Sequence, residues 1–555
     1  MKKQGFIYGS VILAASAVIT KLIGAFFRIP LAGLLGGTGM GYFSCAYGIF
    51  LPVYAVTAAG LPAAAACITA RDIASNGGAS LRRIKNTALL LFTAAGLAGM
   101  LIIMAAALPF CRYAAHDSAA LPSVIMIAPA VLFGCPCAVL RGFCEGRRNM
   151  YPTALSQVAE ALTKLAAGLC GAYGVTKLFY SDPDLFCRIT GTSLRSEELA
   201  LSYASAAACG GISLSVLAGL VFMIIYDLAN GRKAVSEVTG KGTVMSAETV
   251  VRELTAIAVP GAVCALVTNI TSMIDLATIM NSLETAYDRD PSVFAQYALP
   301  RSEIPNFIYG SFSGLAITVF NLVPSVTNMF GRGILPIASE AYGNGDKKAL
   351  AKCSEDVIFA AGAVSIPCGI GITVLARPIL SLLFSDSKAE IIAASPSLSA
   401  MGAGIIFLCI SAAIFPVFQA AGRQDIPVKL MAAGAAVKAA GNILLVPIPR
   451  LNAVGAAIST DISYFVVCTA ALILLKRITG CSLKNIFSIC GKLFFAGILC
   501  GAGAYLSYDM LTERLGGGVS TVVSVCFGAV IYIISTYFEG LFDKSTLKML
   551  ISQKN

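Results

Sequence analysis

Residues 6–33 read FIYGSVILAASAVITKLIGAFFRIPLAG, an apolar stretch long enough to cross a bilayer as one helix. Its two charged residues, Lys21 and Arg28, lie seven residues apart and therefore on one helix face. A charge at bilayer depth costs roughly 2.5–3.5 kcal/mol on insertion scales, so it usually faces a protein-lined, wet interior. The stretch predicts a membrane-spanning helix that presents two cations to an internal cavity suited to an anionic cargo. The alternative is that a tilted helix lets both side chains reach the membrane surfaces.

The composition of the whole chain is that of a polytopic membrane protein. Of its 555 residues, 57% are hydrophobic and only 12% are charged, and the mean hydropathy is +0.81. The 18 cysteines mostly stand singly in apolar runs, which favours small core residues over a disulfide or metal framework. The single histidine, His116, falls in a short predicted exterior loop. We therefore expect no catalytic residues, no metal site and no cofactor.

Fourteen apolar stretches predict fourteen transmembrane helices, the fourth of which covers 121–141 and ends at Arg141. Of the 40 Lys and Arg residues, 26 fall in or at the edges of segments predicted to face the cytoplasm, and 10 fall in exterior loops. This bias follows the positive-inside rule and predicts that both termini are cytoplasmic. The net charge of +11 then reflects topology and contact with lipid headgroups, and no nucleic-acid partner is expected because the chain has no basic soluble module.

Two blocks of sequence repeat with an offset of about 270 residues. Residues 141–164 read RGFCEGRRNMYPTALSQVAEALTK, and residues 416–438 read PVFQAAGRQDIPVKLMAAGAAVK. A looser pair matches GYFS at Gly41 with GSFS at Gly310. The repeats predict an all-α membrane fold with a six-helix lobe at 1–240, a second at 245–478 and a two-helix C-terminal tail at 479–555. The lobes would be related by a pseudo-two-fold axis along the membrane normal, with the substrate between them.

Four segments carry a resemblance to a known family. They are KLIGAFFRIPLAGLLGGTGMGYFSCAYGIF (21–50), GLPAAAA (60–66), EGRRNMYPTALSQVAEALTK (145–164) and SMIDLA (272–277). Together they resemble the polysaccharide-flippase branch of the multidrug/oligosaccharidyl-lipid/polysaccharide exporter superfamily, and most of all the Gram-positive MurJ-type lipid II flippases and stage V sporulation protein B. The resemblance implies a multi-pass protein of the bacterial plasma membrane. It also implies lobes that open alternately to the two sides and an undecaprenyl-diphosphate-linked saccharide as cargo.

The substrate residues follow from this resemblance and from helical spacing. Arg28 matches the first-helix arginine of the lipid II flippases and is the first predicted phosphate contact, with Lys21 as its helper. The chain departs from the family in having Ile29 where an acidic residue often follows and in lacking charges across 42–70. The other predicted contacts are Glu160 and Lys164 in the fifth span and Asn321 and Asn328 in the eighth.

Each of these further contacts has an alternative. Glu160 and Lys164 lie at i and i+4, so they could instead form an ion pair within their own helix. Asn321, Ser325, Asn328 and Arg332 form one stripe, which either faces the cavity or makes a hydrogen-bonded seam between helices.

The ion-coupling residues are predicted to be Asp275, Lys438 and Asn442. An acidic group at bilayer depth needs a cation, and Lys438 and Asn442 lie at i and i+4 in the eleventh span. In related flippases, side chains at what look like comparable places coordinate sodium. We expect the Lys438 ammonium to substitute for that ion, so that transport couples to protons or to the membrane potential. The alternative is a structural salt bridge.

Three classes of function fit a chain of this kind. The leading one is a flippase for a lipid-linked saccharide, with lipid II or a spore, capsule or teichoic intermediate as cargo. The second is a multidrug or organic-cation exporter of the same superfamily, and the third is a membrane glycosyltransferase or polymerase. The cations of the first span disfavour the second class, and the short exterior loops disfavour the third. We expect a monomer, with membrane lipids around it and the tail at 479–555 forming a groove for the prenyl chain or only packing.

Overall fold

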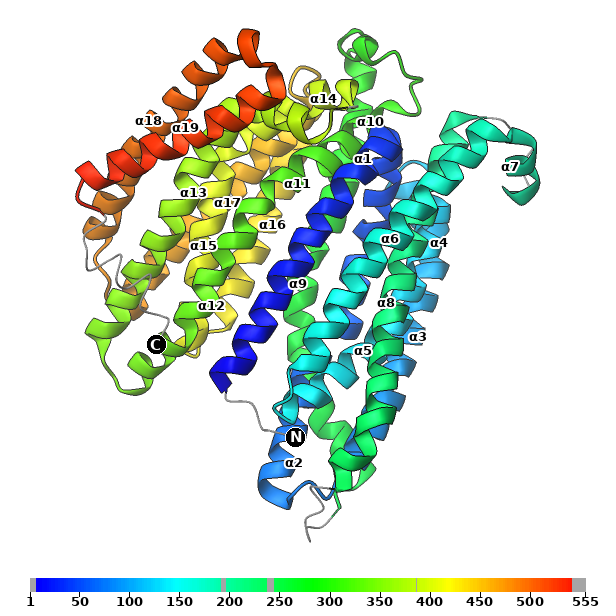
Figure 1. Cartoon of the computed structure of the whole chain (residues 1–555), viewed down its shortest axis with the longest axis vertical. Coiled ribbons are helices and arrows are strands. Elements are labelled where there is room, and N and C mark those ends of the chain that lie inside the picture. Colours follow the sequence, from blue (N-terminus) through cyan, green and yellow to red (C-terminus); the bar gives the residue numbers. More distant parts are fainter. Residues whose placement is uncertain (1–5, 191–195, 237–243, 386, 542–555) are drawn as a thin grey trace. The chain divides into compact units, whose positions relative to one another are not determined.

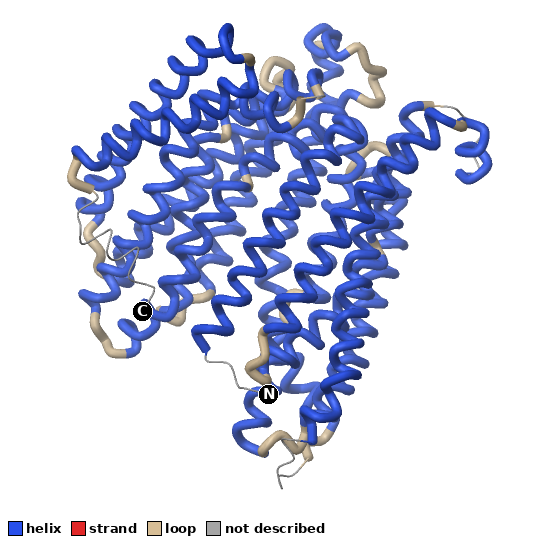
Figure 2. The backbone as a smooth tube through the Cα atoms, in the orientation of Figure 1, coloured by secondary structure: helices blue, strands red, loops and turns tan. Residues whose placement is uncertain are grey.

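The computed structural model describes residues 6–190, 196–236, 244–385 and 387–541. Within these ranges every regular element is a helix (Figures 1 and 2). The chain divides into two compact units: unit 1 is Met1–Asn281 with Leu299–Gly310, and unit 2 is Ser282–Ala298 with Ser311–Asn555. The three-part division at 240, 245 and 479 stays a prediction.

Unit 1 consists of the helices up to Asn281, which follow one another along the chain, and of the later segment 299–310. They are α1 (Phe6–Ala58), α2 (Leu61–Asn76), α3 (Leu81–Tyr113), the short η1 (Ser118–Ala120), α4 (Leu121–Ile127), α5 (Pro129–Gly146), α6 (Tyr151–Ser181), α7 (Pro183–Thr190), α8 (Glu197–Ser236), α9 (Ala247–Arg289) as far as Asn281, and α10 (Ile304–Ser311) as far as Gly310. One apolar core joins α2, α3, α5 and α9 through buried side chains that include Leu61, Ile84, Val139 and Val250.

Unit 2 holds the remaining helices. They are the end of α9, η2 (Pro291–Tyr297), the π-helical turn η3 (Phe312–Ala316), α11 (Ile317–Phe320), α12 (Leu322–Gly343), α13 (Lys347–Leu383), α14 (Lys388–Ala400), α15 (Gly402–Ala420), α16 (Asp425–Leu445), α17 (Asn452–Thr479), α18 (Leu483–Leu515) and α19 (Gly517–Phe538). The last two helices pack on α13, where Leu493 and Tyr532 are buried beside Ile366. The Tyr532 hydroxyl donates a hydrogen bond to the Ala363 carbonyl at 3.0 Å.

The long helix α1 is two helical arms joined at Gly36. Gly36 has φ 60° and ψ −170°, a backbone conformation that is essentially restricted to glycine. The rings of Phe27 and Phe43 lie 6.2 Å apart, whereas sixteen residues of continuous helix would separate them by about 24 Å. The chain therefore reverses at Gly36 and brings the two arms side by side. This reversal puts Arg28 of the first arm next to Tyr47 of the second.

Replacing Gly36 with alanine is expected to destabilise the protein by about 1–3 kcal/mol, because a Cβ is strained in this conformation. Gly33→Ala is the matched control, since that glycine lies in the helical first arm and a Cβ there meets nothing within 4 Å. Thermal unfolding of the purified variants in detergent measures the difference. Equal melting temperatures for the two variants would contradict the strained reversal.

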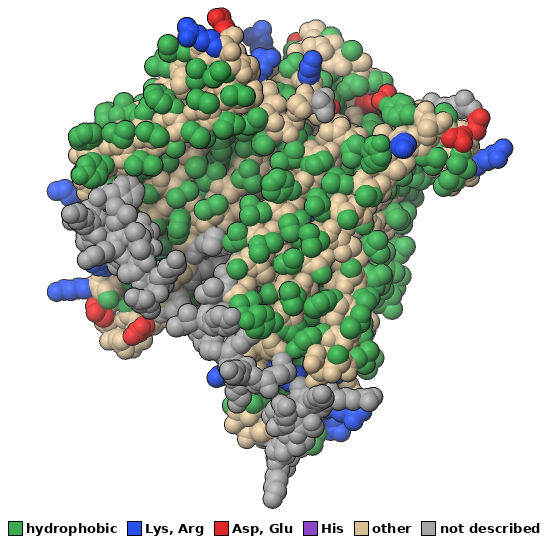
Figure 3. Space-filling view, in the orientation of Figure 1, with side chains coloured by type: hydrophobic (Ala, Val, Ile, Leu, Met, Phe, Trp, Pro, Cys, Tyr) green, Lys and Arg blue, Asp and Glu red, His purple; other side chains and the backbone are tan. Residues whose placement is uncertain are grey.

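Eleven helical stretches in the described residues are long and apolar enough to cross a membrane. The first of them, Ala15–Ser75, spans the reversal at Gly36, and α6 and α9 are not among the eleven. On the face drawn in Figure 3, hydrophobic side chains cover the lengths of the helices, and charged side chains gather near helix ends. The protein is a multi-pass, all-helical membrane protein, and the count of fourteen spans stays a prediction.

Candidate functional site

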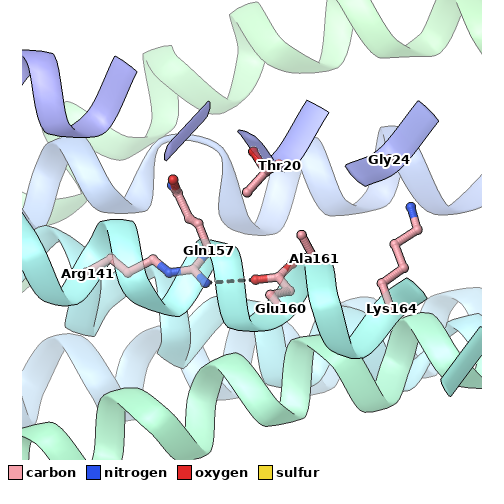
Figure 4. A pocket seen from close by; sticks show the side chains of 7 residues that line it. All are labelled: Thr20, Gly24, Arg141, Gln157, Glu160, Ala161 and Lys164. Atoms are coloured by element: carbon pink, nitrogen blue, oxygen red, sulfur yellow. Dashed lines mark hydrogen bonds and ion pairs between the residues drawn. The ribbon is translucent and has the colours of Figure 1, made fainter. Parts of the chain in front are cut away.

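A pocket of about 320 Å³ lies inside unit 1, between α1, α5 and α6. It is lined by Thr20, Gly24, Arg141, Gln157, Glu160, Ala161 and Lys164 (Figure 4). The lining residues of α6 recur every three or four positions, and Thr20 and Gly24 are four residues apart on α1, so each helix turns one face to the pocket. The pocket contains both Glu160 and Lys164, which were predicted from the sequence.

Glu160 forms its ion pair with Arg141 of α5. Arg141 Nη2 donates to Glu160 Oε2 at 2.7 Å, and Arg141 Nε donates to Ser156 Oγ at 2.8 Å. The side chains of Arg141 and Glu160 are 15% and 29% exposed, and Figure 4 shows the two groups facing each other across the pocket wall. The alternative of a Glu160–Lys164 pair within one helix is therefore wrong, because a better-placed guanidinium on the neighbouring helix takes the carboxylate.

Lys164 is held by aromatic side chains of α1. Its Nζ lies 3.0 Å from the Tyr47 hydroxyl, 4.9 Å from the centre of the Phe27 ring and 5.7 Å from that of Tyr47. The Arg28 guanidinium lies 6.0 Å from the same Tyr47 ring. Aromatic faces attract cations without neutralising their charge. Arg28 and Lys164 thus both lie beside Tyr47, Arg28 from α1 and Lys164 from the neighbouring helix α6.

Lys21 occupies a more open position on α1. Its side chain is exposed, whereas Thr20 and Gly24 beside it line the pocket. Gln157, which also lines the pocket, accepts a hydrogen bond from Ser16 Oγ at 3.1 Å and so ties α6 to α1. The role of Lys21 as a helper of Arg28 stays a prediction.

The stripe of the eighth span lies in unit 2 and begins at a helix break. Asn321 is exposed at the junction of α11 and α12, and its carbonyl accepts a hydrogen bond from Ser325 Oγ at 2.7 Å. Asn328 is half-buried one turn further along α12, and the side chain of Arg332 lies outside the described residues. The choice between a cavity and a hydrogen-bonded seam stays a prediction.

The three predicted ion-coupling residues are divided between the two units. Asp275 is half-buried on α9 in unit 1, and Lys438 and Asn442 lie on α16 in unit 2. Asn442 is buried, and its side-chain oxygen accepts a hydrogen bond from Ser459 Oγ. Within unit 1, Asp275 and Arg28 both lie close enough to Tyr309 to act on its hydroxyl electrostatically. The pairing of Asp275 with Lys438 stays a prediction.

The residues that the sequence did not single out are Tyr47, Phe27 and Arg141. Nothing distinguishes Phe27 and Tyr47 from the many other aromatic residues of apolar helices. Arg141 had been placed at the cytoplasmic edge of the fourth span, but α5 continues to Gly146. A carboxylate at bilayer depth needs a cation, so Glu160 itself was the sequence signal that could have pointed to Arg141. Among the described residues, no group of three or more His, Cys, Asp or Glu side chains is arranged to hold a metal.

Apolar helices enclosing a pocket with positive side chains define a multi-pass membrane protein with an internal polar site. The family model described as "Lipid II flippase MurJ" matches residues 81–524 of this chain. The chain belongs to this family, which confirms the resemblance seen in the sequence.

Two curated relatives match over nearly their whole lengths. Lipid II flippase MurJ of Bacillus subtilis (strain 168) is 21% identical over 97% of this chain and 96% of that protein. Stage V sporulation protein B of the same organism is 21% identical over 99% of this chain and 98% of that protein. Sequence similarity therefore covers both units.

Solved structures show the same fold at low sequence identity. A lipid II flippase MurJ in an inward closed conformation has a TM-score of 0.67 and 13% identity, covering 96% of this chain and 99% of its own. An inward-facing multidrug resistance MATE family transporter of the MOP superfamily has a TM-score of 0.61 and 13% identity, covering 85% and 95%. The fold is thus shared by flippases and exporters, and the site must distinguish them.

Proposed function

We propose that this protein is a flippase that moves lipid II, an undecaprenyl-diphosphate-linked saccharide, from the cytoplasmic to the outer leaflet of the bacterial plasma membrane. The observation that carries this proposal is the meeting of Arg28 and Lys164 around Tyr47 in a chain of the MurJ family. The proposed architecture has fourteen spans, two six-helix lobes related by a pseudo-two-fold axis, a two-helix tail and cytoplasmic termini. The proposed transporter works as a monomer and performs no catalysis.

The positive side chains suit the diphosphate of such a cargo. A lipid diphosphate carries about two negative charges, which cannot cross hydrocarbon unaided. The Arg28 guanidinium offers a planar set of donors for phosphate oxygens, and the Lys164 ammonium offers a mobile point charge. Because Arg141 already neutralises Glu160, no unpaired carboxylate of this wall would repel the phosphates. Thr20 and Gln157 supply polar groups that can hydrogen-bond to the rest of the headgroup.

The prenyl chain is assigned to an apolar cavity in unit 2. This cavity has a volume of about 620 Å³ and lies between α13, α18 and α19, with Ala363, Ile372, Cys500, Val525 and Ile533 among its lining residues. Its lining is almost wholly hydrocarbon, which favours a lipid tail over a polar group. In this proposal, α18 and α19 therefore help to bind the prenyl chain in addition to packing on α13.

Rescue of a Gram-positive strain depleted of its own lipid II flippase tests the cargo. We expect expression of this chain to restore growth and to restore lipid II that an externally added probe can reach in the outer leaflet. An Arg28→Ala variant present in the membrane at the same level is the matched control, and it should not rescue. Absence of rescue by the wild-type chain, at a normal membrane level, would overturn lipid II as the cargo.

A second candidate cargo is a lipid-linked saccharide used in spore formation. It is favoured by the similarity to stage V sporulation protein B, which covers 99% of this chain at the same 21% identity as the lipid II flippase. The chain should therefore also be expressed in a strain that lacks the sporulation protein. Rescue of that strain alone would select the spore intermediate over lipid II.

A further inference from the structure

The segment 299–310 packs unusually closely against the reversal of α1. A Cβ on Gly310 would clash with the backbone of Gly37 and Gly41, and a Cβ on Gly41 would lie 2.6 Å from the Asn306 carbonyl oxygen. All of these residues belong to unit 1. Helix α10, from Asn306 to Gly310, and the second arm of α1 therefore meet backbone to backbone, which only glycine permits at Gly41 and Gly310.

One polar contact fastens the same segment to the turn between α3 and α4. The Asn306 amide donates a hydrogen bond to Asp117 Oδ2, and Asp117 Oδ1 accepts one from the Ala119 amide at 2.8 Å. The turn itself is fixed to α8, because Ser202 Oγ donates to the Ala119 carbonyl at 2.5 Å. Asp117 is thus linked to α8 through Ala119, and Asn306 links the segment to Asp117.

Negative charge concentrates around this attachment. Two further carboxyl groups lie within electrostatic range of Asp117. They belong to Glu198 of α8 and to Glu303 of the segment itself. From α1, the buried Tyr42 hydroxyl lies near Asp117 and Glu198 but makes no hydrogen bond of normal geometry. His116 precedes Asp117 on the turn, Arg301 precedes Glu303 on the segment, and both of these side chains are exposed.

Docking of the segment 299–310 therefore brings the carboxyl groups of Asp117, Glu198 and Glu303 close together and shields them from water. Burial, with Glu198 adding to it, raises the pKa of Asp117 above its ordinary value. Burial, with Glu198, Asp117 and Glu197 adding to it, raises the pKa of Glu303 above its ordinary value as well. A protonated carboxyl in this cluster would remove one repulsion and could donate a hydrogen bond to a neighbouring carboxylate.

We propose that residues 299–310 form a latch on unit 1, and that closing this latch against Asp117 and the α1 reversal takes up a proton in the Asp117–Glu198–Glu303 cluster. The proton comes from the aqueous phase at this end of the unit, which is the exterior in the orientation of the proposed function. Because the closed latch binds protons more tightly than the open one, its stability is fully present below the ordinary carboxyl pKa of about 4 and falls as pH rises through the raised values. Acidity at this surface would thus favour closure.

Hydrogen–deuterium exchange of the full-length protein in lipid nanodiscs tests the latch without any cargo. Exchange of the 299–310 peptide is followed from pH 5 to pH 8 and corrected for the intrinsic pH dependence of amide exchange. In the wild type, protection should fall as the pH rises across this range. The double variant Glu198→Gln/Glu303→Gln should keep its protection at pH 8. Glu248→Gln, which removes an exposed carboxylate of α9 outside this cluster, is the matched control and should behave as the wild type.

Two further variants separate the latch from general unfolding. Asn306→Ala should lower protection of the 299–310 peptide at every pH, and Gly310→Val should abolish it, while α3 peptides keep wild-type protection in both. Protection of the wild-type segment that does not depend on pH, or an unchanged pH dependence in the double glutamine variant, would overturn the proposal. Because no lipid-linked saccharide is present, this result is independent of whether lipid II is the cargo.

Discussion

Arg28→Ala is expected to slow flipping of lipid II in proteoliposomes by about 10- to 100-fold, since a hydrogen bond to a charged group is worth about 1.5–3 kcal/mol. The loss should be smaller in Arg28→Lys, which keeps the charge but not the planar pair of donors. Lys164→Met should cause a similar loss to Arg28→Ala, because the two cations meet around Tyr47. A single-turnover assay with fluorescent lipid II measures the rates.

Lys177→Ala provides the matched control for the removal of one positive charge. Lys177 lies on α6, as Lys164 does, but it is exposed, and it does not line the pocket. Its removal should change the flipping rate by less than about twofold, in keeping with the small effects of exposed surface charges. Wild-type rates in both Arg28→Ala and Lys164→Met would remove these residues from the phosphate site. Full activity in Arg28→Lys would show that charge alone is required there.

Glu160→Gln is expected to destabilise the protein by about 2–4 kcal/mol, because it leaves the Arg141 guanidinium largely buried without its anion. The melting temperature in detergent should fall by roughly 2–4 °C, since the shift per kcal/mol shrinks as the chain lengthens. Replacing both partners, as in Arg141→Met/Glu160→Leu, should recover most of the loss, since a buried ion pair can be exchanged for apolar packing at little cost. Scanning calorimetry or fluorescence-detected unfolding measures both variants.

An exposed ion pair of the same chain is the control for this prediction. Lys429 Nζ lies 2.8 Å from Asp425 Oδ2, and the two side chains are 76% and 42% exposed. Lys429→Ala should therefore change the stability by no more than about 0.5 kcal/mol. The assignment of Arg141 and Glu160 as a buried structural pair would be wrong if Glu160→Gln melted with the wild type. It would also be wrong if the double variant were less stable than the single one.

The sequence predicted the charged side chains of the site better than their partners. The cost of a charge at bilayer depth is large and independent of fold, so Arg28, Glu160 and Lys164 stood out within apolar stretches, although the same argument also selected Lys21, whose side chain is exposed. Their partners depend on which helices are neighbours, which spacing along one helix cannot tell. For this reason the sequence suggested an ion pair of Glu160 with Lys164 on the same helix, whereas in the structure Glu160 pairs with Arg141 of α5.

Other differences between the sequence-based prediction and the structure concern where helices end or break. The fourth span was expected to end at Arg141, but α5 runs on to Gly146 and carries Arg141 into the bundle. The eighth span was treated as one helix, whereas the structure has a π-helical turn at 312–316 and a break at Asn321. Apolar composition identifies a membrane segment without fixing where its hydrogen-bonding pattern changes, and π-helical turns occur as single-turn insertions inside α-helices.

The cancellation of Glu160 by Arg141 has an electrical consequence for the transport cycle. It leaves the Lys164 ammonium, which contacts the Phe27 ring and the Tyr47 hydroxyl, as one elementary charge that a phosphate would neutralise and that an unloaded carrier would retain. Each charge that crosses the full membrane field exchanges about 2.3 kcal/mol per 100 mV. An inside-negative voltage would therefore act little on the loaded step and would pull the unloaded site back toward the cytosol. In such a cycle, the return of the unloaded protein would carry net charge across the membrane. The resting membrane potential of the cell would then make export directional.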